Sequence, residues 1–453
     1  MIKTINPSSG SLIAEYDFFS QEKVNSIISD TYLSYRTWKE LDIRVRISCL
    51  EKLGKALSDN KEELARLITN EMGKLFSESL QEIDKSISLC SYLSEVAIDN
   101  IDIHQKLDFH NTKVTCSPLG IVFGVMPWNF PVWQVMRYSL PSLLIGNGVL
   151  LKHAPNVSGV SLYLENLFER SGFNKNIFRS LIITEDTVHK VISDKRVQAV
   201  SFTGSDKVGA LIASTAGKFI KKTVLELGGS DPFIILSDAN IEEAFDAAFY
   251  ARMQNMGQSC IAAKRFIVED SIYIPFIEYI VERIKKLKFG SPFDVSTSIA
   301  PLASFKGLKA IESQVNQSTA DGAKLIAPLE ELKDTKGCYF APKIITNAES
   351  SMPVLNEEVF GPVFTVCSSS PNNIIKIANN TKYGLGASIW TSNEKIAEKF
   401  ANHINSGMVF INDITKSSPG IPFGGIKKSG YGRELSPLGL YEFANIKSIF
   451  SKA

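Results

Sequence analysis

The stretch Val197-Gln-Ala-Val-Ser-Phe-Thr-Gly-Ser-Asp-Lys-Val-Gly209 shows how this chain is built. Its first residues form a short buried strand pattern, and the residues that follow combine two glycines with a helix start. A strand that turns through glycine into a helix aims backbone N–H groups and the positive end of the helix dipole at a phosphate. The spacing is not G-x-G-x-x-G, so the motif alone is weak evidence for a nucleotide. The residues predicted to lie at the phosphates are Thr203, Gly204, Ser205 and Gly209.

The same alternation of strand and helix continues on both sides of this stretch. Short buried runs at 121–125 and 148–152, bounded by Gly and Pro, are typical of parallel strands. The helices between these strands are expected at 158–170, 186–194 and 207–216. Beyond Gly228 the pattern predicts strands at 233–236 and 265–268 and helices at 241–256 and 274–287. This is a doubly wound α/β pattern, in which ligands bind at the carboxyl ends of the strands.

The two ends of the chain depart from this alternation. Residues 21–100 have a helical pattern, with Val24, Ile27 and Ile28 on one face, and a short strand at 12–16 precedes them. A last strand is expected at 446–450. The sequence therefore predicts an all-helical lead-in before the α/β part.

Composition restricts the classes of protein and partner. At about 150 residues per domain, 453 residues suggest two or three domains. The net charge of +1 provides no field for nucleic acid or an anionic membrane surface. Six cysteines without C-x-x-C spacing and five unclustered histidines argue against disulfides and metal sites. We therefore expect no bound metal. No apolar stretch reaches the roughly 18 residues of a membrane span, so we expect a cytoplasmic protein.

Cys260 follows Gly257-Gln-Ser, where small or amide side chains leave a thiol accessible to a substrate. A thiol has a pKa of roughly 8.5 and needs a shifted pKa or a base to act as a nucleophile. The nearby cations Lys264 and Arg265 are expected to lower the pKa of this thiol. The alternative is a buried structural cysteine.

Two further residues could assist a nucleophile. Glu226 lies among apolar residues at a strand end, where desolvation raises the pKa of a carboxylate toward that of a general base. Asn129, between Pro127 and Pro131, is held as a donor to a developing oxyanion. The alternatives are a solvent-facing strand end for Glu226 and a local turn for Asn129.

A third group of residues suits the sugars of a nucleotide. Glu358 could accept hydrogen bonds from ribose hydroxyls, with Phe360 as a flat face beside it. Lys152, at the end of a predicted buried strand, could bind a sugar or balance a phosphate charge.

Together these motifs resemble those of the aldehyde dehydrogenase superfamily, in order and spacing, over essentially the whole chain. They are Pro127-Trp-Asn-Phe-Pro131, Phe202-Thr-Gly-Ser205, Leu225-Glu-Leu-Gly-Gly229, Gly257-Gln-Ser-Cys260, Glu358-Val-Phe-Gly-Pro362 and Pro422-Phe-Gly-Gly425. The resemblance implies a Rossmann-like cofactor domain with its helical lead-in, an α/β catalytic domain and a small β flap that pairs subunits into a homodimer or homotetramer. The implied ranges are 1–100, 118–227 and 419–440 for the first, 228–418 for the second, and 101–117 with 441–453 for the flap.

The resemblance also implies a role for each motif residue. Cys260 is the nucleophile that forms a thiohemiacetal and then a thioester, and Asn129 with the Cys260 N–H binds the oxyanion. Glu226 activates the water that hydrolyses the thioester. The cofactor residues are Lys152 and Glu358 at the two riboses, Phe360 at the nicotinamide, Ser205 at the pyrophosphate, and Trp128, Thr203, Gly204, Gly209 and Leu227 around them.

The cofactor prediction depends on one position. NAD-preferring relatives often carry a Glu three residues after the lysine, and here Pro155 stands there. Without that carboxylate a 2′-phosphate is admitted, and Lys152 or His153 could face it. We therefore expect NADP, possibly with NAD as well.

The substrate prediction concerns a distal carboxylate, because the chain is similar to short bacterial succinate-semialdehyde dehydrogenases. Arg137, eight residues after Asn129, suits bidentate carboxylate binding, and Ser418 is a further contact. Gln254 replaces a second Arg. The alternatives are another small aldehyde such as glyceraldehyde or lactaldehyde, a CoA-acylating enzyme, a cofactor-free thiol esterase, and a surface or inter-subunit ion pair for Arg137.

Overall fold

The computed structural model describes residues 1–101, 112–333 and 335–451. The chain begins with an antiparallel pair, β1 (Ile2–Ile5) and β2 (Leu12–Tyr16). The predicted helical lead-in follows as α1 (Gln21–Trp38), α2 (Ile43–Asp59), α3 (Lys61–Met72) and α4 (Phe76–Ile101). In α1 the side chain of Ser20 accepts a hydrogen bond from the Lys23 N–H and caps the helix. No helix in the described ranges is long and apolar enough to cross a membrane.

The first α/β unit has a six-stranded sheet in which all pairs are parallel except that of β16 with β8. Its strands, in spatial order, are β16 (Gly430–Tyr431), β8 (Lys222–Glu226), β7 (Val197–Thr203), β4 (Ile121–Met126), β5 (Gly148–His153) and β6 (Phe178–Ser180). Its helices are α5 (Trp133–Ile145), η1 (Pro155–Val157), α6 (Ser158–Arg170), α7 (Glu185–Ser193) and α8 (Asp206–Lys218). Helix α5 is buried along its whole length and packs against α2, α4, β4 and β5, so it is a rigid support for the site.

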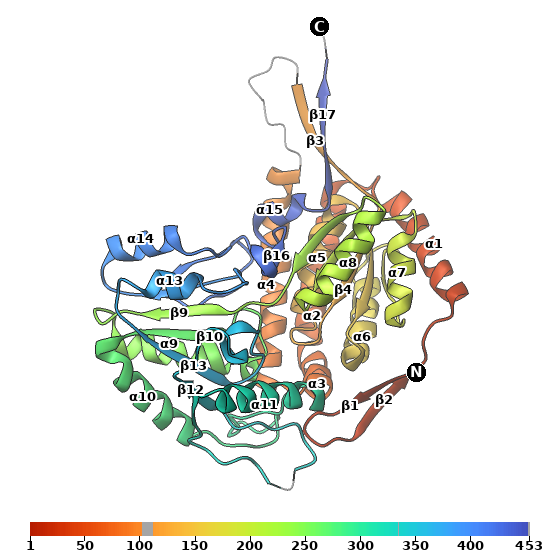
Figure 1. The fold of residues 1–453 in the computed structure, drawn as a ribbon. Coiled ribbons are helices and arrows are strands. Elements are labelled where there is room, and N and C mark those ends of the chain that lie inside the picture. Colours follow the sequence, from red (N-terminus) through yellow and green to blue (C-terminus); the bar gives the residue numbers. More distant parts are fainter. Residues whose placement is uncertain (102–111, 334, 452–453) are drawn as a thin grey trace.

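The second α/β unit has a seven-stranded sheet, parallel except for the pair of β11 and β12. Its strands, in spatial order, are β11 (Lys324–Ile326), β12 (Lys343–Thr346), β13 (Val363–Ser369), β10 (Ala263–Glu269), β9 (Asp231–Ile235), β14 (Ser388–Trp390) and β15 (Phe410–Ile411). The helices are α9 (Ile241–Met253), η2 (Gln254–Gly257), η3 (Asp270–Ile272), α10 (Tyr273–Lys285), α11 (Phe305–Ala320), α12 (Pro353–Asn356), α13 (Ile374–Asn379) and α14 (Glu394–His403). Figure 1 shows the two units side by side.

The predicted α/β fold class is therefore confirmed. The chain passes from the six-stranded sheet to the seven-stranded sheet between β8 and β9, and it returns between β15 and β16. The division into domains stays a prediction. One expected element is shorter than predicted, because the helix expected at 241–256 ends at Met253, and Asn255 and Met256 adopt left-handed φ angles of 52°.

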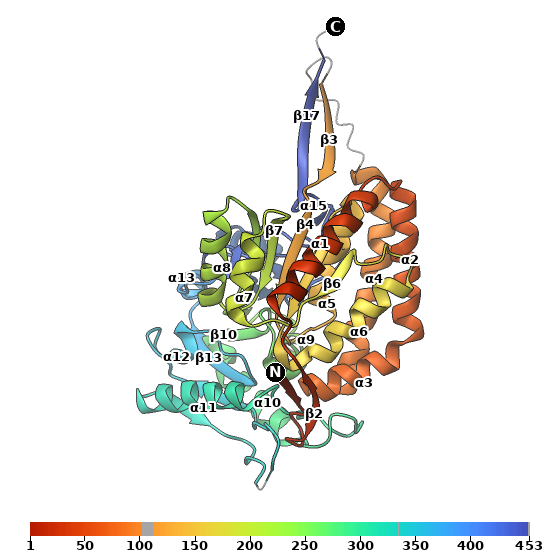
Figure 2. The same cartoon turned by 90° about the vertical axis from the view of Figure 1, so that its right-hand side faces the viewer.

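A two-stranded arm projects from this body. It pairs β3 (Thr112–Pro118) with β17 (Ala444–Phe450) in antiparallel register, after η4 (Lys427–Ser429) and α15 (Ser436–Tyr441). Both views show the arm standing clear of the two units (Figures 1 and 2). The predicted flap at 101–117 and 441–453 includes these strands, and its residues 102–111 and 452–453 lie outside the described residues.

Candidate active site

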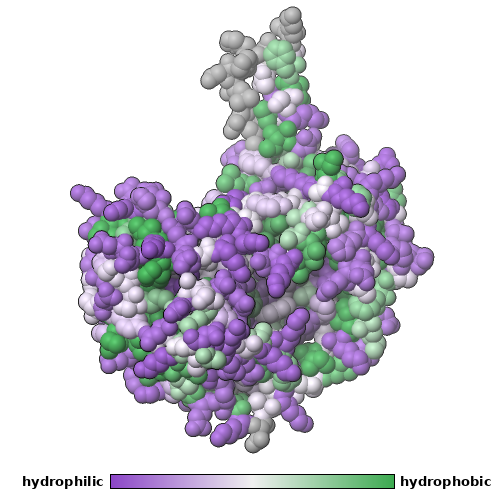
Figure 3. All heavy atoms as spheres, viewed as in Figure 1, coloured by the Kyte–Doolittle hydropathy of each residue, from purple (hydrophilic) through white to green (hydrophobic). Residues whose placement is uncertain are grey.

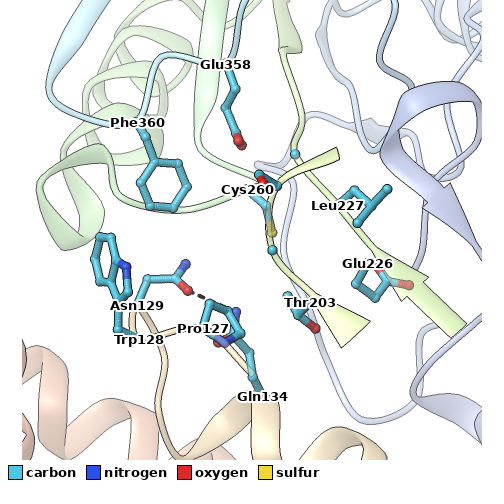
Figure 4. A pocket seen from close by; sticks show the side chains of 13 residues that line it. Pro127, Trp128, Asn129, Gln134, Thr203, Glu226, Leu227, Cys260, Glu358 and Phe360 are labelled. Atoms are coloured by element: carbon cyan, nitrogen blue, oxygen red, sulfur yellow. Dashed lines mark hydrogen bonds between the residues drawn. The ribbon is translucent and has the colours of Figure 1, made fainter. Parts of the chain in front are cut away.

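A cavity of about 260 Å³ lies where β7 and β8 end and the loop before β10 begins. Its walls bring together the three predicted catalytic side chains and most of the predicted cofactor residues, as Figure 4 shows. The lining residues are Pro127, Trp128, Asn129, Gln134, Thr203, Gly204, Ser205, Glu226, Leu227, Gly228, Cys260, Glu358 and Phe360. Motifs that are far apart in the sequence therefore meet in one cavity.

The loop that carries Cys260 is held in an unusual backbone conformation. Asn255, Met256 and Gly257 have consecutive positive φ angles. Gly257 is required there, since a Cβ would lie 2.4 Å from an Arg252 Nη and 2.5 Å from the Gly361 carbonyl oxygen. The buried Arg252 guanidinium donates to the carbonyl oxygen of Gly257 at 2.6 Å. The buried Arg252 side chain thus holds the segment of the loop that precedes Cys260.

The Cys260 thiol is free, and its pKa is raised to about 12, chiefly by burial. The expectation of a lowered pKa is wrong, although Arg137 and Lys264 do act in that direction. The Lys264 ammonium is occupied by the loop's carbonyl oxygens, including that of Cys260 at 2.7 Å. Arg265 points to the carbonyl oxygens of other segments. The thiol is therefore protonated at neutral pH and needs a base.

Asn129 lies buried between β4 and α5 with its amide orientation fixed. Its Nδ2 donates to the backbone carbonyl oxygen of Gln258 at 3.1 Å, so its Oδ1 faces the other way. That Oδ1 accepts a hydrogen bond of 3.1 Å from the Nε2 of Gln134 (Figure 4). Since Nδ2 carries two hydrogens, one N–H remains available for an oxyanion.

Glu226 ends β8 and is 2% exposed, and neither of its carboxylate oxygens has a hydrogen-bond partner among the described residues. Burial raises the pKa of Glu226 well above its ordinary value, and Glu434 raises it further. Arg137 and Arg433 oppose this increase. A carboxyl group in this state is suited to receive a proton in a reaction rather than to form a permanent ion pair.

The cofactor side of the cavity combines donors, acceptors and flat faces. Ser205 is the N-cap of α8, so the helix N-terminus points at the cavity wall. Glu358 accepts a hydrogen bond from the Gly229 N–H at 3.0 Å and lies 3.7 Å from the Lys264 ammonium. A Cβ on Gly228 would lie 2.5 Å from a Glu358 oxygen, so a side chain there would displace the Glu358 carboxylate. The rings of Trp128 and Phe360 meet edge to face at 5.7 Å.

Three predicted cofactor residues lie outside the cavity lining. Lys152 ends β5 and is 9% exposed, with its pKa lowered chiefly by burial. Pro155 is exposed at the start of η1. Gly209 lets α8 approach Leu227, because a Cβ there would lie 2.5 Å from a Leu227 methyl carbon.

His153 does not face a phosphate, contrary to the expectation. Its ring is 6% exposed, its Nδ1 accepts from the Ala154 N–H at 3.0 Å, and its Nε2 lies 2.9 Å from the Pro131 carbonyl oxygen. Burial lowers the pKa of His153 to about 4, so the ring is neutral. Of the two residues considered, this leaves Lys152 for a 2′-phosphate.

The predicted substrate residues are not gathered as expected. Arg137 is buried inside the subunit, where its Nε lies 2.7 Å from a Glu434 oxygen and its guanidinium lies over the Phe423 ring. This is neither a surface pair nor an inter-subunit pair. Gln254 donates to the Tyr250 hydroxyl at 3.3 Å, and neither Gln254 nor Ser418 lines the cavity. Their role at a substrate stays a prediction.

The sequence did not single out three polar residues in or beside the site: Lys85, Gln134 and Ser417. Gln134 lines the cavity, and Lys85 donates to Ser417, which also accepts from Trp133 next to Gln134. A signal for Gln134 was present, because Gln134 and Arg137 fall on one face of a helix that is otherwise almost entirely apolar. Lys85 gave none. It stands three residues after Glu82 on α4, which is typical of a solvated ion pair.

The arrangement offers a nucleophile, an oxyanion donor and a base around one cavity, with a nucleotide-type wall beside them. No group of three or more His, Cys, Asp or Glu side chains in the described part of the chain could hold a metal ion. The nucleophile, the oxyanion donor, the base and the nucleotide-type wall together define a cofactor-assisted acyl-transfer site that uses a cysteine. The aldehyde dehydrogenase family model matches residues 1–449, and the chain belongs to that family.

Within the family, the comparisons point to one group. The chain is 41% identical over 453 residues to a probable NADP+ succinate-semialdehyde dehydrogenase of Synechocystis, covering 99% of each chain. It is 38% identical to the NAD(P)+ succinate semialdehyde dehydrogenase Sad of Escherichia coli, over 99% of this chain and 97% of the other. The fold matches succinic semialdehyde dehydrogenase of Streptococcus pyogenes, crystallised with NADP+, at a TM-score of 0.97 and 35% identity over 100% of both chains.

Proposed function

We propose that this protein oxidises succinate semialdehyde to succinate, with NADP+ as the hydride acceptor and NAD+ as a second, less favoured one. The observation that carries the proposal is the cavity itself, in which Cys260, Asn129 and Glu226 share walls with Glu358 and Phe360. Membership of the family supplies the reaction class, and the arrangement of these side chains supports the individual roles.

The first step is the attack of Cys260 on the aldehyde carbon. Because the thiol pKa is about 12, its proton must pass to a base, and Glu226 is the carboxylate on the same wall. The S–C bond forms, and the carbonyl oxygen becomes the oxyanion of a thiohemiacetal. The free N–H of Asn129 stabilises this charge. Losing one such donor costs about 2.7–4 kcal/mol of barrier stabilisation.

The second half of the reaction returns the enzyme to its starting state. A nicotinamide cofactor held by Glu358 and Phe360 would supply the hydride acceptor that converts the thiohemiacetal into a thioester on Cys260. Glu226 first releases to solvent the proton that it took from Cys260. It then takes a proton from water, and the resulting hydroxide attacks the thioester. The carboxylic acid leaves, and Cys260 is released as a thiolate that regains its proton. The burial of Glu226 raises its pKa, which strengthens it as a base.

The residues present fit a nicotinamide dinucleotide. The α8 N-terminus at Ser205 suits a phosphate, and Glu358 has an oxygen beside Gly228 where no side chain intrudes. The Phe360 ring, which meets Trp128 edge to face, offers a flat face for a planar ring. We propose that Glu358 binds the nicotinamide ribose and Lys152 the adenosine ribose.

The preference for NADP is proposed from charge. Pro155 stands where a carboxylate would repel a 2′-phosphate, and it is exposed. Lys152 is the nearby cation, while His153 is neutral and turned inward. The Synechocystis relative is described as NADP+-dependent and the Escherichia coli relative as NAD(P)+-dependent, which supports use of both.

The proposed substrate follows from the relatives and from the cations near Cys260. The relatives reported above act on succinate semialdehyde. The guanidinium of Arg137 lowers the pKa of Cys260, so its charge reaches the reacting sulfur. An aldehyde with a distal carboxylate would be attracted to this positive environment.

We also propose that two or four copies of the chain assemble through the arm. Its outer strand β17 exposes Ile446, Ile449 and Phe450 by 57%, 45% and 64%. Hydrophobic residues are visible along the arm in Figure 3. A two-stranded ribbon is marginally stable alone, so pairing with another subunit would cover both its apolar side chains and its free edges.

A cytoplasmic location is part of the proposal. All six cysteines are unpaired, and Cys260 must remain a thiol to act. Free cysteines persist in a reducing compartment.

The test is a matrix of steady-state kcat/KM values. Succinate semialdehyde, butyraldehyde and glyceraldehyde are each assayed with NADP+ and with NAD+ by the absorbance of the reduced cofactor. A preference of about tenfold or more for succinate semialdehyde over butyraldehyde, or about 1.4 kcal/mol, supports the proposal. Equal values would leave a general aldehyde dehydrogenase, and no reduced cofactor with any aldehyde would contradict the reaction itself.

A further inference from the structure

A polar cluster joins α4, α5 and the chain before β16 at the substrate side of the cavity. The Lys85 ammonium donates to the Ser417 Oγ at 2.6 Å, and the indole Nε1–H of Trp133 donates to the same Oγ at 3.0 Å. The Lys85 Nζ also lies 4.5 Å from the Trp133 ring centre. Because the Ser417 oxygen accepts two hydrogen bonds, its own O–H points elsewhere and is available as a donor.

The described residues give Lys85 no carboxylate as a direct partner. Asp84, which directly precedes Lys85 in the sequence, pairs with Lys61 at 2.6 Å. Glu82 uses one oxygen for the N–H groups of Val132 and Trp133 and the other for Lys74 at 2.7 Å. Across the described ranges, no carboxylate lies within 4.0 Å of the Lys85 ammonium. Burial lowers the pKa of Lys85 to about 7, as expected for an ammonium group without a counter-ion.

Arg137 provides the contrast within the same region. Its Nε lies 2.7 Å from a Glu434 oxygen, and both side chains are almost fully buried. Most of its charge is therefore compensated inside the protein. Lys85 is the cation that a ligand can still pair with.

The cluster is linked to the wall of the catalytic cavity through helix α5. Trp133 is the neighbour of Gln134, which lines the cavity together with Cys260. The Arg137 guanidinium acts on Lys85 by lowering its pKa, and a Cys260 thiolate would act in the opposite direction. We infer that Lys85 and Ser417 form the binding site for the carboxylate at the far end of the substrate, with Arg137 behind them. This inference rests on the proposed function and specifies how that function selects its aldehyde.

The protonation of Lys85 gives the site a pH dependence. A carboxylate pairs with the ammonium form, so the KM for an anionic aldehyde should rise as the pH increases through about 7. The charged or titratable groups that act on Lys85 are Arg137 and Lys74, which favour the neutral amine, and Glu82 and Cys260, which favour the ammonium. Bound carboxylate favours the ammonium as well and so raises the pKa of Lys85.

The experiment uses the full-length variants Lys85→Met and Lys85→Arg with saturating NADP+. For Lys85→Met we expect kcat/KM to fall at least about tenfold with succinate semialdehyde, through KM, and to change less than about twofold with butyraldehyde. Lys85→Arg should retain the selectivity and lose the rise of KM between about pH 6 and about pH 8, because an arginine stays charged. Lys61→Met is the matched control, since Lys61 pairs with the exposed Asp84.

Two outcomes would overturn the inference. The first is a Lys85→Met variant that keeps the wild-type ratio between the two aldehydes, and the second is an equal loss with both. If Lys85→Met does not fold, Ser417→Ala with the same two aldehydes replaces it and should lower the ratio. The ratio of kcat/KM for the two aldehydes in the wild-type enzyme distinguishes a failure of this binding site from a failure of the proposed function. A wild-type enzyme without preference contradicts the function, whereas a preference that survives Lys85→Met and Ser417→Ala contradicts only this site.

Discussion

The cavity around Cys260 has two sides that the chain builds in different ways. On the cofactor side, each polar group stands in a short motif, such as Thr203-Gly-Ser205 or Glu226-Leu-Gly228. On the substrate side, the contacts join remote segments, and Lys85 and Ser417 are separated by 332 positions. A motif fixes its own backbone, whereas a remote pair depends on how helices pack. The cofactor side should therefore be predictable from the sequence, whereas the substrate side is revealed only by the structure.

The largest effect is expected for Cys260→Ala, on the side that motifs define. Turnover should fall by about four orders of magnitude or more, because no other group supplies the covalent bond. NADP+ should still bind, measured by quenching of tryptophan fluorescence. Aldehyde oxidation by this variant would contradict the assignment of the nucleophile and with it the motif-based account of the cavity.

Glu226→Gln should cost about 10²–10⁴-fold in turnover, as expected for a lost general base. The amide keeps the shape but cannot take a proton from water, so the thioester should accumulate after a burst of reduced cofactor. Because the pKa of Glu226 is raised, its deprotonated fraction and the wild-type hydrolysis rate should still increase with pH above the range in which an ordinary glutamate titrates. Stopped-flow measurements at several pH values check this, and an unchanged pH profile in the variant would be evidence against the role.

Asn129→Ala should lower kcat by about 10²–10³-fold with little change in the affinity for NADP+. The variant removes the N–H that remains after the bond to the Gln258 carbonyl oxygen. The measurement is kcat for succinate semialdehyde and for butyraldehyde. Equal losses are expected with both, since the oxyanion is common to them, and a loss confined to one aldehyde would place Asn129 on the substrate side instead.

Much of the fold was readable because burial patterns are local. The predicted helix 158–170 coincides with α6, and strands β4, β5 and β7 lie within a residue of expectation. The end of α9 was wrong, since a helical pattern does not reveal that Asn255 and Met256 take left-handed angles to place Cys260. Tertiary contact, rather than propensity, sets that conformation.

The candidate site was only partly readable. Residue types at Cys260, Glu226 and Asn129 indicated their chemistry, but the pKa of Cys260 was expected to move the wrong way because sequence does not show burial. Arg137 was predicted to bind a substrate carboxylate, yet in the structure it pairs with Glu434, which none of the quoted motifs contains. Lys85 was missed because a lysine near a glutamate on a helix is normally solvated.

Gln134 lies on the boundary between the two sides and gives the smallest and sharpest test. Its Nε2 holds the Oδ1 of Asn129, while its own Oε1 is buried without a partner in the described structure. Gln134→Met should lower kcat about three- to tenfold at unchanged KM for NADP+, which corresponds to about 0.5–1.5 kcal/mol for one neutral hydrogen bond. Gln317→Met, an exposed glutamine on helix α11, is the matched control.

A double-mutant cycle decides what this loss means. If Gln134 acts by orienting Asn129, then Gln134→Met should have almost no effect in the Asn129→Ala background, because the amide that it orients is gone. An undiminished loss in that background would show that Gln134 acts directly on the substrate through Oε1. The first result would assign Gln134, on α5, to the motif-defined side of the cavity together with Asn129. The second would leave Asn129 on that side and assign Gln134 to the substrate side.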